Sequence, residues 1–225
     1  MDVAAEKNFD VRQERFGLQA QFLAPVFNLF QDLPSFSRQI FSALGPHYGL
    51  RLTDLRFETG SGSLGDVCLR LSWPSLAEAR IFLDRVELDS SYLQFLGFEN
   101  RDLVADVLST IAEYVGDVKF RAYSVTQEAH GALVGQSRKD FFAQFVSVVP
   151  EGLGPALGAG LAFYFGSEDE RLASSVTLDF SRTVDGGVFV QYVTLYDASK
   201  MPPRKIQESA RSEFKTICGR IGLSR

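Results

Sequence analysis

Few side chains in this sequence have the types and spacing that metal or nucleophilic chemistry requires. The 225 residues include two histidines, His47 and His130, and two cysteines, Cys68 and Cys218. No histidine has a cysteine or carboxylate at the spacing of zinc ligands, and no G-x-S-x-G, H-E-x-x-H or C-x-x-C motif occurs. We therefore expect no cofactor and no metal. Both cysteines are predicted to be free and buried, with a disulfide as the alternative.

Carboxylates offer a second route to chemistry. Glu168–Glu170 form an acidic run in a turn-like segment, which favours a solvated position. Paired catalytic acids or a hard-metal site would need inward-facing carboxylates from different strands. The short segments that end at Asp84 and at Asp179 are similar in sequence. These two residues are therefore the candidates for such a pair. The simpler interpretation gives each a role at a strand edge or a β-bulge.

Two glycine-rich stretches have partial resemblance to phosphate-binding loops. The stretch from Gly60 to Gly65 fits G-x-G-x-x-G, but it joins two strand-like runs instead of leading from a strand into a helix. A hairpin loop is the better interpretation. The stretch from Gly131 to Ser137 leads into a helix but lacks the Gly-Lys-Ser/Thr of a P-loop. It is interpreted as a loop followed by a helix N-cap.

Charge is unevenly distributed along the chain. The net charge is −5, yet residues 200–225 contain seven basic and two acidic residues. Three bases, Arg204, Arg211 and Lys215, form a partial stripe that Glu208 interrupts, too few for nucleic-acid binding on an acidic body. The stripe is a solvated face or a docking surface for an acidic partner. Arg204, Arg211, Lys215 and Trp73, the single tryptophan, are the predicted partner-binding residues.

The predicted helices and strands that would position the candidate residues occur in the same order in both halves of the chain. A polar tail, residues 1–14, is expected to be flexible. In the first half, alternation predicts strands and a 3.6-residue period predicts helices. Glycine and proline at residues 45 and 46 are expected to end the first helix. A change of face predicts a bulge at Asp84-Arg85. The expected elements are a strand at 15–22, a helix from about residue 33 to 44, strands at 50–59, 66–73 and 79–88, and a helix at 100–116.

The second half repeats this order. Ser137, followed by Asp140, is a capping-box-like start for a helix through Val148. Residues 187–196 are apolar on both faces, which is typical of a central strand. The expected elements are a strand at 118–127, a helix from 137 to 148, strands at 161–165, 173–182 and 187–196, and a helix after Pro202-Pro203.

The two halves also match in detail at their last helices. Residues 100–116 match residues 204–219 at a constant offset, with Gly116 on Gly219. The sequence therefore predicts an α+β fold of two tandem β-α-β-β-β-α repeats, residues 15–116 and 117–225, packed together as one unit. Helices that follow runs of strands predict an antiparallel sheet with the helices packed on one face.

This order of elements resembles the duplicated saddle of the TATA-box-binding protein and, more loosely, helix-grip ligand-binding folds. The resemblance implies one curved sheet around a pseudo-twofold axis. It rests on element order alone, so it implies no function.

The predicted location and function rest on the sequence motifs and segments that the chain contains and lacks. No apolar run approaches the length of a membrane span, and the first residues lack the apolar stretch of a secretory signal, so a cytoplasmic location is expected. The interpretation is a non-catalytic protein–protein interaction module that self-associates or binds a partner protein. The alternatives are a small-molecule-binding protein with a pocket between sheet and helices and, third, an enzyme of unknown reaction.

Overall fold

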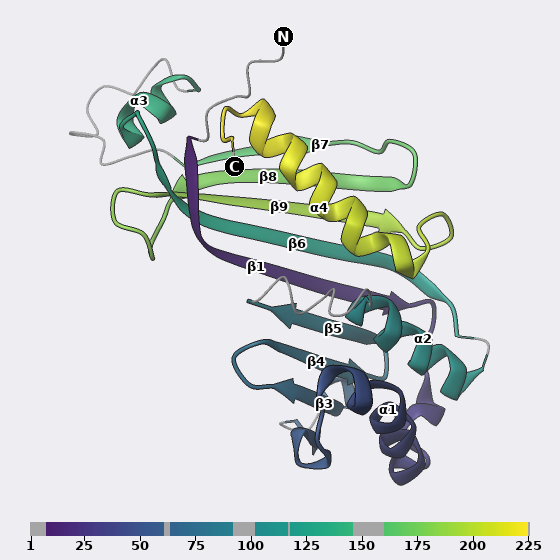
Figure 1. Cartoon of the computed structure of the whole chain (residues 1–225). Helices are drawn as coiled ribbons and strands as arrows, with labels where there is room; N and C mark the ends of the chain where they lie inside the picture. The colour runs from purple at the N-terminus through teal and green to yellow at the C-terminus, as the bar shows by residue number, and fades with distance from the viewer. Residues whose placement is uncertain (1–7, 61–63, 92–101, 117, 146–159, 225) are drawn as a thin grey trace.

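Nine strands form one antiparallel sheet in the computed structural model (Figure 1). The structure describes residues 8–60, 64–91, 102–116, 118–145 and 160–224. The strands are β1 (Phe9–Phe22), β2 (Leu55–Glu58), β3 (Cys68–Trp73), β4 (Ala77–Phe82), β5 (Arg85–Ser90), β6 (Phe120–Leu133), β7 (Leu161–Phe165), β8 (Arg171–Phe180) and β9 (Val188–Asp197). The helices are α1 (Leu33–Tyr48), α2 (Leu103–Val115), α3 (Arg138–Ala143) and α4 (Pro203–Arg220), with short 3-10 turns η1 (Phe27–Phe30), η2 (Leu52–Asp54) and η3 (Leu64–Asp66).

The sheet order is β2-β3-β4-β5-β1-β6-β9-β8-β7. Its two longest strands, β1 and β6, have 14 residues each and pair with one another at the centre. β9 lies between β6 and β8, the central position that its composition predicted, and it is fully buried on one face and half-buried on the other. The edges are β2 on one side and β7 on the other.

Alternation of side chains gives the sheet a covered face and an open face. In β1, Phe16, Leu18 and Ala20 are buried on the covered face. Arg15 and Gln19 point to the other face, which carries none of the helices of the described residues and which we call the helix-free face. Figure 1 shows α1, α2 and α4 on one side of the sheet. The mixed α+β, antiparallel architecture predicted from the sequence is confirmed.

The core divides into two clusters that one helix connects. One cluster lies under α1 and α2, and the other lies under α3 and the end of α4. In α4, Ile206 and Ala210 belong to the first cluster, whereas Phe214 and Cys218 belong to the second. These residues are spaced by four, so they form one stripe along the helix. The stripe of α4 therefore stabilises both ends of the sheet.

The starts of α2 and α3 follow local capping rules. Asp102 caps α2 by accepting from Ala105 N at 3.2 Å, and Ser137 caps α3 by accepting from Asp140 N at 3.1 Å. The first helix does not end at Gly45-Pro46, as the sequence predicted. It continues to Tyr48 and ends at Gly49, whose φ is 64°. The last turn is retained because Tyr48 is buried and its hydroxyl donates to Asp106 on α2.

The prediction of one bulged strand at residues 79–88 is wrong, because this segment forms two strands joined by a turn. The chain reverses at Leu83 and Asp84, and the two segments pair as β4 and β5, with Ile81 opposite Val86. A reversal switches the buried face just as a bulge does, so the alternation could not distinguish them. The first half therefore reads β-α-β-β-β-β-α, whereas the described elements of the second half read β-α-β-β-β-α.

Other boundaries also differ from the expected ones. Residues 9–14, expected in a flexible tail, belong to β1, and the backbone N–H groups of Asn8 and Phe9 donate to Ser224 O at 3.1 and 3.0 Å. The predicted strand at 50–59 shortens to β2 because η2 occupies its start. The predicted cap at Asn100 and the predicted helix end at residues 146–148 lie outside the described residues.

Candidate functional site

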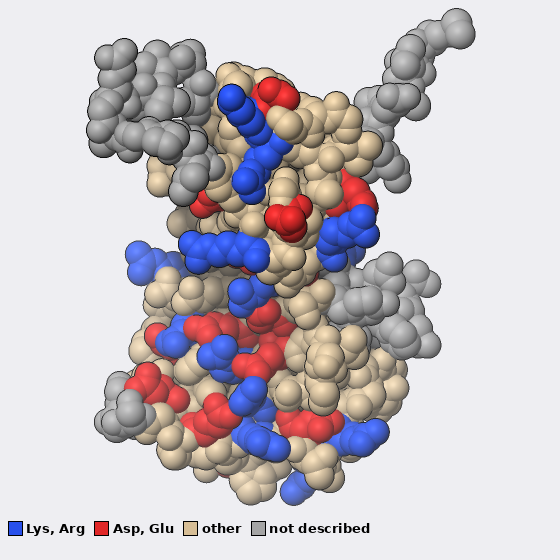
Figure 2. Space-filling view, turned by 90° about the vertical axis from the view of Figure 1, so that its left-hand side faces the viewer, with Lys and Arg blue, Asp and Glu red and all other residues tan. Residues whose placement is uncertain are grey.

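The helix-free face of β2 to β5 carries a chain of alternating charges, which we call the ion-pair ladder. Each arginine bridges two carboxylates: Arg70 Nη1 lies 3.1 Å from Glu58 Oε1, and Arg80 Nε lies 2.8 Å from Glu78 Oε1. Figure 2 shows acidic and basic side chains intermingled over the lower part of the molecule. In order, the ladder contains Glu58, Arg70, Glu78, Arg80, Glu87, Arg85 and Asp84.

Strand register explains why the ladder runs diagonally. Arg56 lies opposite Arg70, and Arg70 lies opposite Arg80, so directly opposed residues would repel each other. Arg70 instead reaches Glu58 and Glu78 one row away, whereas Arg80 lies directly opposite its partner Glu87. The hydrogen bonds that Arg70 donates to Glu58 and Glu78 raise its pKa. Every member has at least one partner of opposite charge, although the three arginines balance only three of the four carboxylates.

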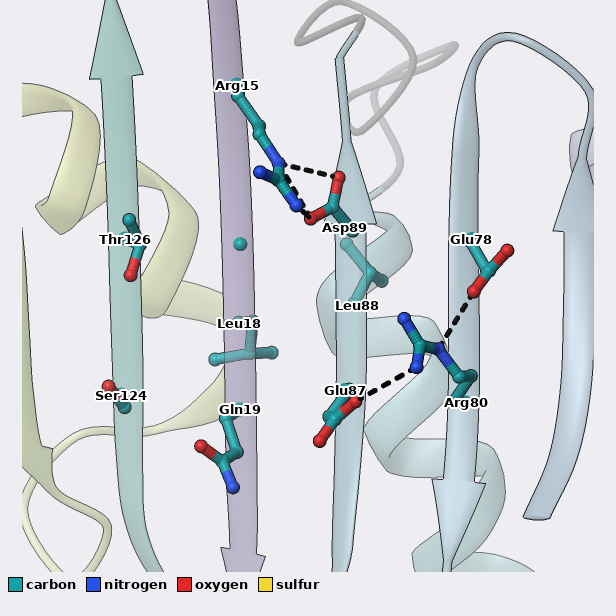
Figure 3. Close-up of a pocket in the computed structure, with 11 residues that line it drawn as sticks. Arg15, Leu18, Gln19, Glu78, Arg80, Glu87, Leu88, Asp89, Ser124 and Thr126 are labelled. Atoms are coloured by element: carbon teal, nitrogen blue, oxygen red, sulfur yellow. Dashed lines mark hydrogen bonds and ion pairs between the residues drawn. The ribbon is translucent and has the colours of Figure 1, made fainter. Parts of the chain in front are cut away.

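A hollow of about 280 Å³ lies beside the ladder, over the central strands (Figure 3). We call it the Gly17 hollow, because Gly17 lies opposite Asp89 on β5 and opposite Thr126 on β6 and has no side chain to fill the space. The remaining lining residues are Arg15, Leu18, Gln19, Glu78, Arg80, Glu87, Leu88 and Ser124.

Arg15 forms one wall of the Gly17 hollow. Its guanidinium donates to both carboxylate oxygens of Asp89, with Nε 2.8 Å from Oδ2, and it lies 3.9 Å from Glu128. The hydrogen bond to Asp89 is the main reason that the pKa of Arg15 is raised. Because the carboxylates around the hollow are paired with arginines, the hollow offers hydrogen bonds to a polar ligand and no evident general base.

His130 lies further along β6 and contacts the loop after β8. Its Nδ1 is 2.9 Å from Ser181 Oγ, and that oxygen also accepts from the N–H groups of Thr183 and Val184. Because the Ser181 oxygen accepts from both backbone N–H groups, its own hydrogen can be donated to His130 Nδ1. This network assigns the imidazole a neutral form with Nδ1 unprotonated. Burial lowers the pKa of His130. The contact connects β6 to the loop after β8.

Three of the four predicted partner-binding residues meet in one groove on α4. The α4 groove has a volume of about 490 Å³. Arg204 and Lys215 are exposed there, whereas Arg211 is half-buried, and burial lowers its pKa. Trp73 is 4% exposed, lies in the core and is not available to a partner in this structure. The groove is lined by Asp102, Arg204, Gln207, Glu208, Arg211, Ser212 and Lys215.

The structure does not bring together the other candidate residues. Asp84 lies in the turn after β4 and Asp179 lies on β8, with β5, β1, β6 and β9 between those strands. Cys68 and Cys218 are free, as predicted, and burial raises the pKa of Cys218 to about 12. Within the described ranges, no group of three or more His, Cys, Asp or Glu side chains is arranged to hold a metal ion.

The stretch at 60–65 connects two strands, as the simpler interpretation predicts, whereas residues 131–133 of the second stretch belong to a strand and not to a loop. Residues 60–65 connect β2 and β3, which are antiparallel neighbours, although residues 61–63 lie outside the described part. Gly131 belongs to β6, and Ser137 caps α3. Neither context is that of a nucleotide-binding loop.

Sequence reasoning missed the residues of the helix-free face. The signal was present in the alternation of charges at Glu78, Arg80, Arg85, Glu87 and Asp89, which places all of them on one side of β4 and β5. It was overlooked because long-range pairing with β1 and β3 is needed to identify their partners.

No protein-family model matches the chain, and no curated protein matches its sequence. Among the helices of the described residues, none has the length and apolar character needed to cross a bilayer.

Proposed function

We propose that this chain is a non-catalytic protein–protein interaction module that binds an acidic segment of a partner protein in the α4 groove, in the cytoplasm. The observation that supports the proposal is the clustering of Arg204, Arg211 and Lys215 along one groove. Asp102 and Glu208 offset part of this charge, so the groove suits a short acidic segment better than a polyanion.

The burial of each base in the α4 groove determines whether its replacement tests binding without affecting folding. Arg211 is half-buried beside Asp102, so its replacement would alter folding as well as binding. Arg204 and Lys215 are exposed, so their replacement should leave stability nearly unchanged. The test variant is therefore the double change Arg204→Glu and Lys215→Glu. The matched control is Lys205→Glu with Arg220→Glu, two exposed bases of the same helix that do not line the groove.

The probe is a fluorescent peptide of alternating Glu and Ser, read by anisotropy at low and physiological salt. Binding to the parent and to the control should weaken with salt, and the groove variant should lose it. Equal binding by the groove variant and the control would show that the groove is only a solvated helix surface.

The small-molecule alternative has one observation in its favour, although in a different place from the one expected. The Gly17 hollow lies on the helix-free face, not between sheet and helices, and presents the hydroxyls of Ser124 and Thr126. A thermal-shift screen of polar metabolites against the parent and Gly17→Leu tests it. Stabilisation by a compound in the parent alone would favour this function.

We also propose that the two halves are tandem repeats. Two arrangements support this: β1 and β6, the first strands of the halves, pair at the centre, and the last strand of each half, β5 or β9, lies beside its own first strand. Superposition of residues 15–116 on 118–221 should align at least four elements in order. Equivalent helices on opposite faces would contradict the duplication.

A further inference from the structure

The two edges of the nine-stranded sheet differ in their chemistry. β2 has four residues and includes Arg56 and Glu58, whereas β7 has the sequence Leu-Ala-Phe-Tyr-Phe. Soluble proteins protect edge strands with charges, prolines or bulges, because an unpaired backbone edge binds other strands. β7 has none of these features. Within the described ranges it pairs with β8 alone.

The side chains of β7 are apolar on both sides of the sheet. Phe163 lies opposite Val176, whose side chain is buried on the covered face, and it is 38% exposed. Tyr164 lies opposite Ser175 on the helix-free face and is 82% exposed. Phe165 is also exposed. Within the described residues, β7 therefore combines a backbone edge that faces no other strand with aromatic side chains, which is the chemistry of a β-strand docking edge.

Charges next to β7 select the direction in which a second β7 could pair. Three acidic residues, Glu168, Asp169 and Glu170, follow two residues after the strand, and Arg171 pairs with the first of them. Parallel pairing of two copies would place these acidic turns side by side, where like charges repel. Antiparallel pairing separates them by the length of the strand, about 17 Å for five residues. That distance is about two Debye lengths at physiological salt.

Antiparallel pairing about Phe163 also gives a complementary set of neighbours. Phe163 would face itself, Leu161 would face Phe165, and Ala162 would face Tyr164 of the second copy. The smallest side chain then lies opposite the largest exposed one, and no charges are opposed. We propose that β7 is the docking edge for β7 of a second copy of this chain, forming an antiparallel dimer with one continuous sheet.

This interface is separate from the α4 groove and does not depend on the function proposed for it. Two paired five-residue strands bury less area than the about 1,200 Å² at the lower end of standard stable interfaces. The dimer should therefore be in rapid exchange with the monomer, with a dissociation constant in the micromolar range. Its assembly should be followed over a concentration series.

Two double variants at the same positions test the pairing. Ala162→Lys with Tyr164→Lys puts like charges opposite each other in an antiparallel dimer. Ala162→Glu with Tyr164→Lys puts opposite charges together in that dimer, but like charges together in a parallel one. Both positions are exposed, so both variants should melt at the temperature of the parent. Leu23→Lys, at a 64% exposed position away from β7, is the control.

The measurement is sedimentation equilibrium of the full chain. We expect the parent, the control and the Glu/Lys variant to dimerise, and the Lys/Lys variant to dimerise at least about tenfold more weakly. A parent that stays monomeric over the whole concentration series would overturn the proposal, because the edge would then be free or would bind the strand of a different protein. Equal association of the two double variants would also overturn it.

Discussion

The hydroxyl of Tyr192 donates to Glu213 Oε2 at 2.6 Å, which connects β9 in the sheet to α4 above it. Tyr192 is 1% exposed, and burial together with the Glu213 carboxylate raises its pKa. Arg171 lies 3.9 Å from the same carboxylate and so balances its charge. A strand, a helix and an ion pair thus meet where α4 crosses from one core cluster to the other.

Replacing Tyr192 with Phe should destabilise the fold without changing its shape. The variant removes the hydrogen bond to Glu213, a charged and partly buried acceptor, and the weaker one that the hydroxyl accepts from Arg171 at 3.4 Å, a loss of about 1 to 2 kcal/mol. Urea unfolding followed by circular dichroism measures the loss. Tyr164→Phe removes the same atom from an 82% exposed ring and should be neutral. Equal effects of the two changes would mean that the Glu213 contact does not stabilise the protein.

Stability should rise with pH through the titration of His130. Burial lowers the pKa of His130 in the folded protein from its ordinary 6.5, so the unfolded chain binds more protons near that pH. The contribution of the neutral ring is complete above pH 6.5 and is lost as the pH falls below it, until the folded pKa is passed. Unfolding free energies at several pH values should show this slope, and His130→Gln should reduce it. An NMR titration with a pKa at or above 6.5 would contradict the prediction.

Two glycines of the central strands should differ sharply in their tolerance of alanine. A Cβ at Gly131 would lie 2.5 Å from the ring of Phe9 and 2.8 Å from Asp10 O, so the backbone would have to move. At Gly17 the nearest atom lies 3.8 Å away. Gly131→Ala should cost about 1 to 3 kcal/mol. Gly17→Ala should be neutral or slightly stabilising, because alanine restricts the unfolded chain. Chemical denaturation of both variants measures their unfolding free energies, and equal losses would contradict the prediction.

Neither half should fold when it is made alone. The core cluster under α1 and α2 includes Tyr123, Tyr196 and Ile206 from the second half, and β1 would lose its longest pairing. Fragments 1–116 and 117–225 should therefore be unfolded separately and should regain ordered structure when mixed. Circular dichroism and NMR spectra test this expectation. A folded single fragment would mean that its own contacts are sufficient.

Local rules predicted the parts of the fold that depend on local sequence. β7 lies where the apolar run predicted it, Ser137 caps α3, and Gly116 ends α2. The reversal at Leu83 and the continuation of α1 through Pro46 depend on contacts with distant segments, so periodicity could not reveal them.

The candidate site was predicted only in part for the same reason. The bases of the α4 groove share one helix, and their spacing places them on one side of it. The burial of Trp73, the half-burial of Arg211 and the Gly17 hollow arise from strand order, which the alternation pattern does not contain.

The path of α4 across both core clusters has a consequence for biosynthesis. Because Ile206 and Phe214 complete different clusters, neither core can close on the ribosome before this late segment has emerged from the exit tunnel. The clasp between Asn8 and Ser224 forms later still, from almost the first and the last described residues. Nascent chains should therefore depend on chaperones until α4 has emerged, since the long central strands expose apolar surface up to that point.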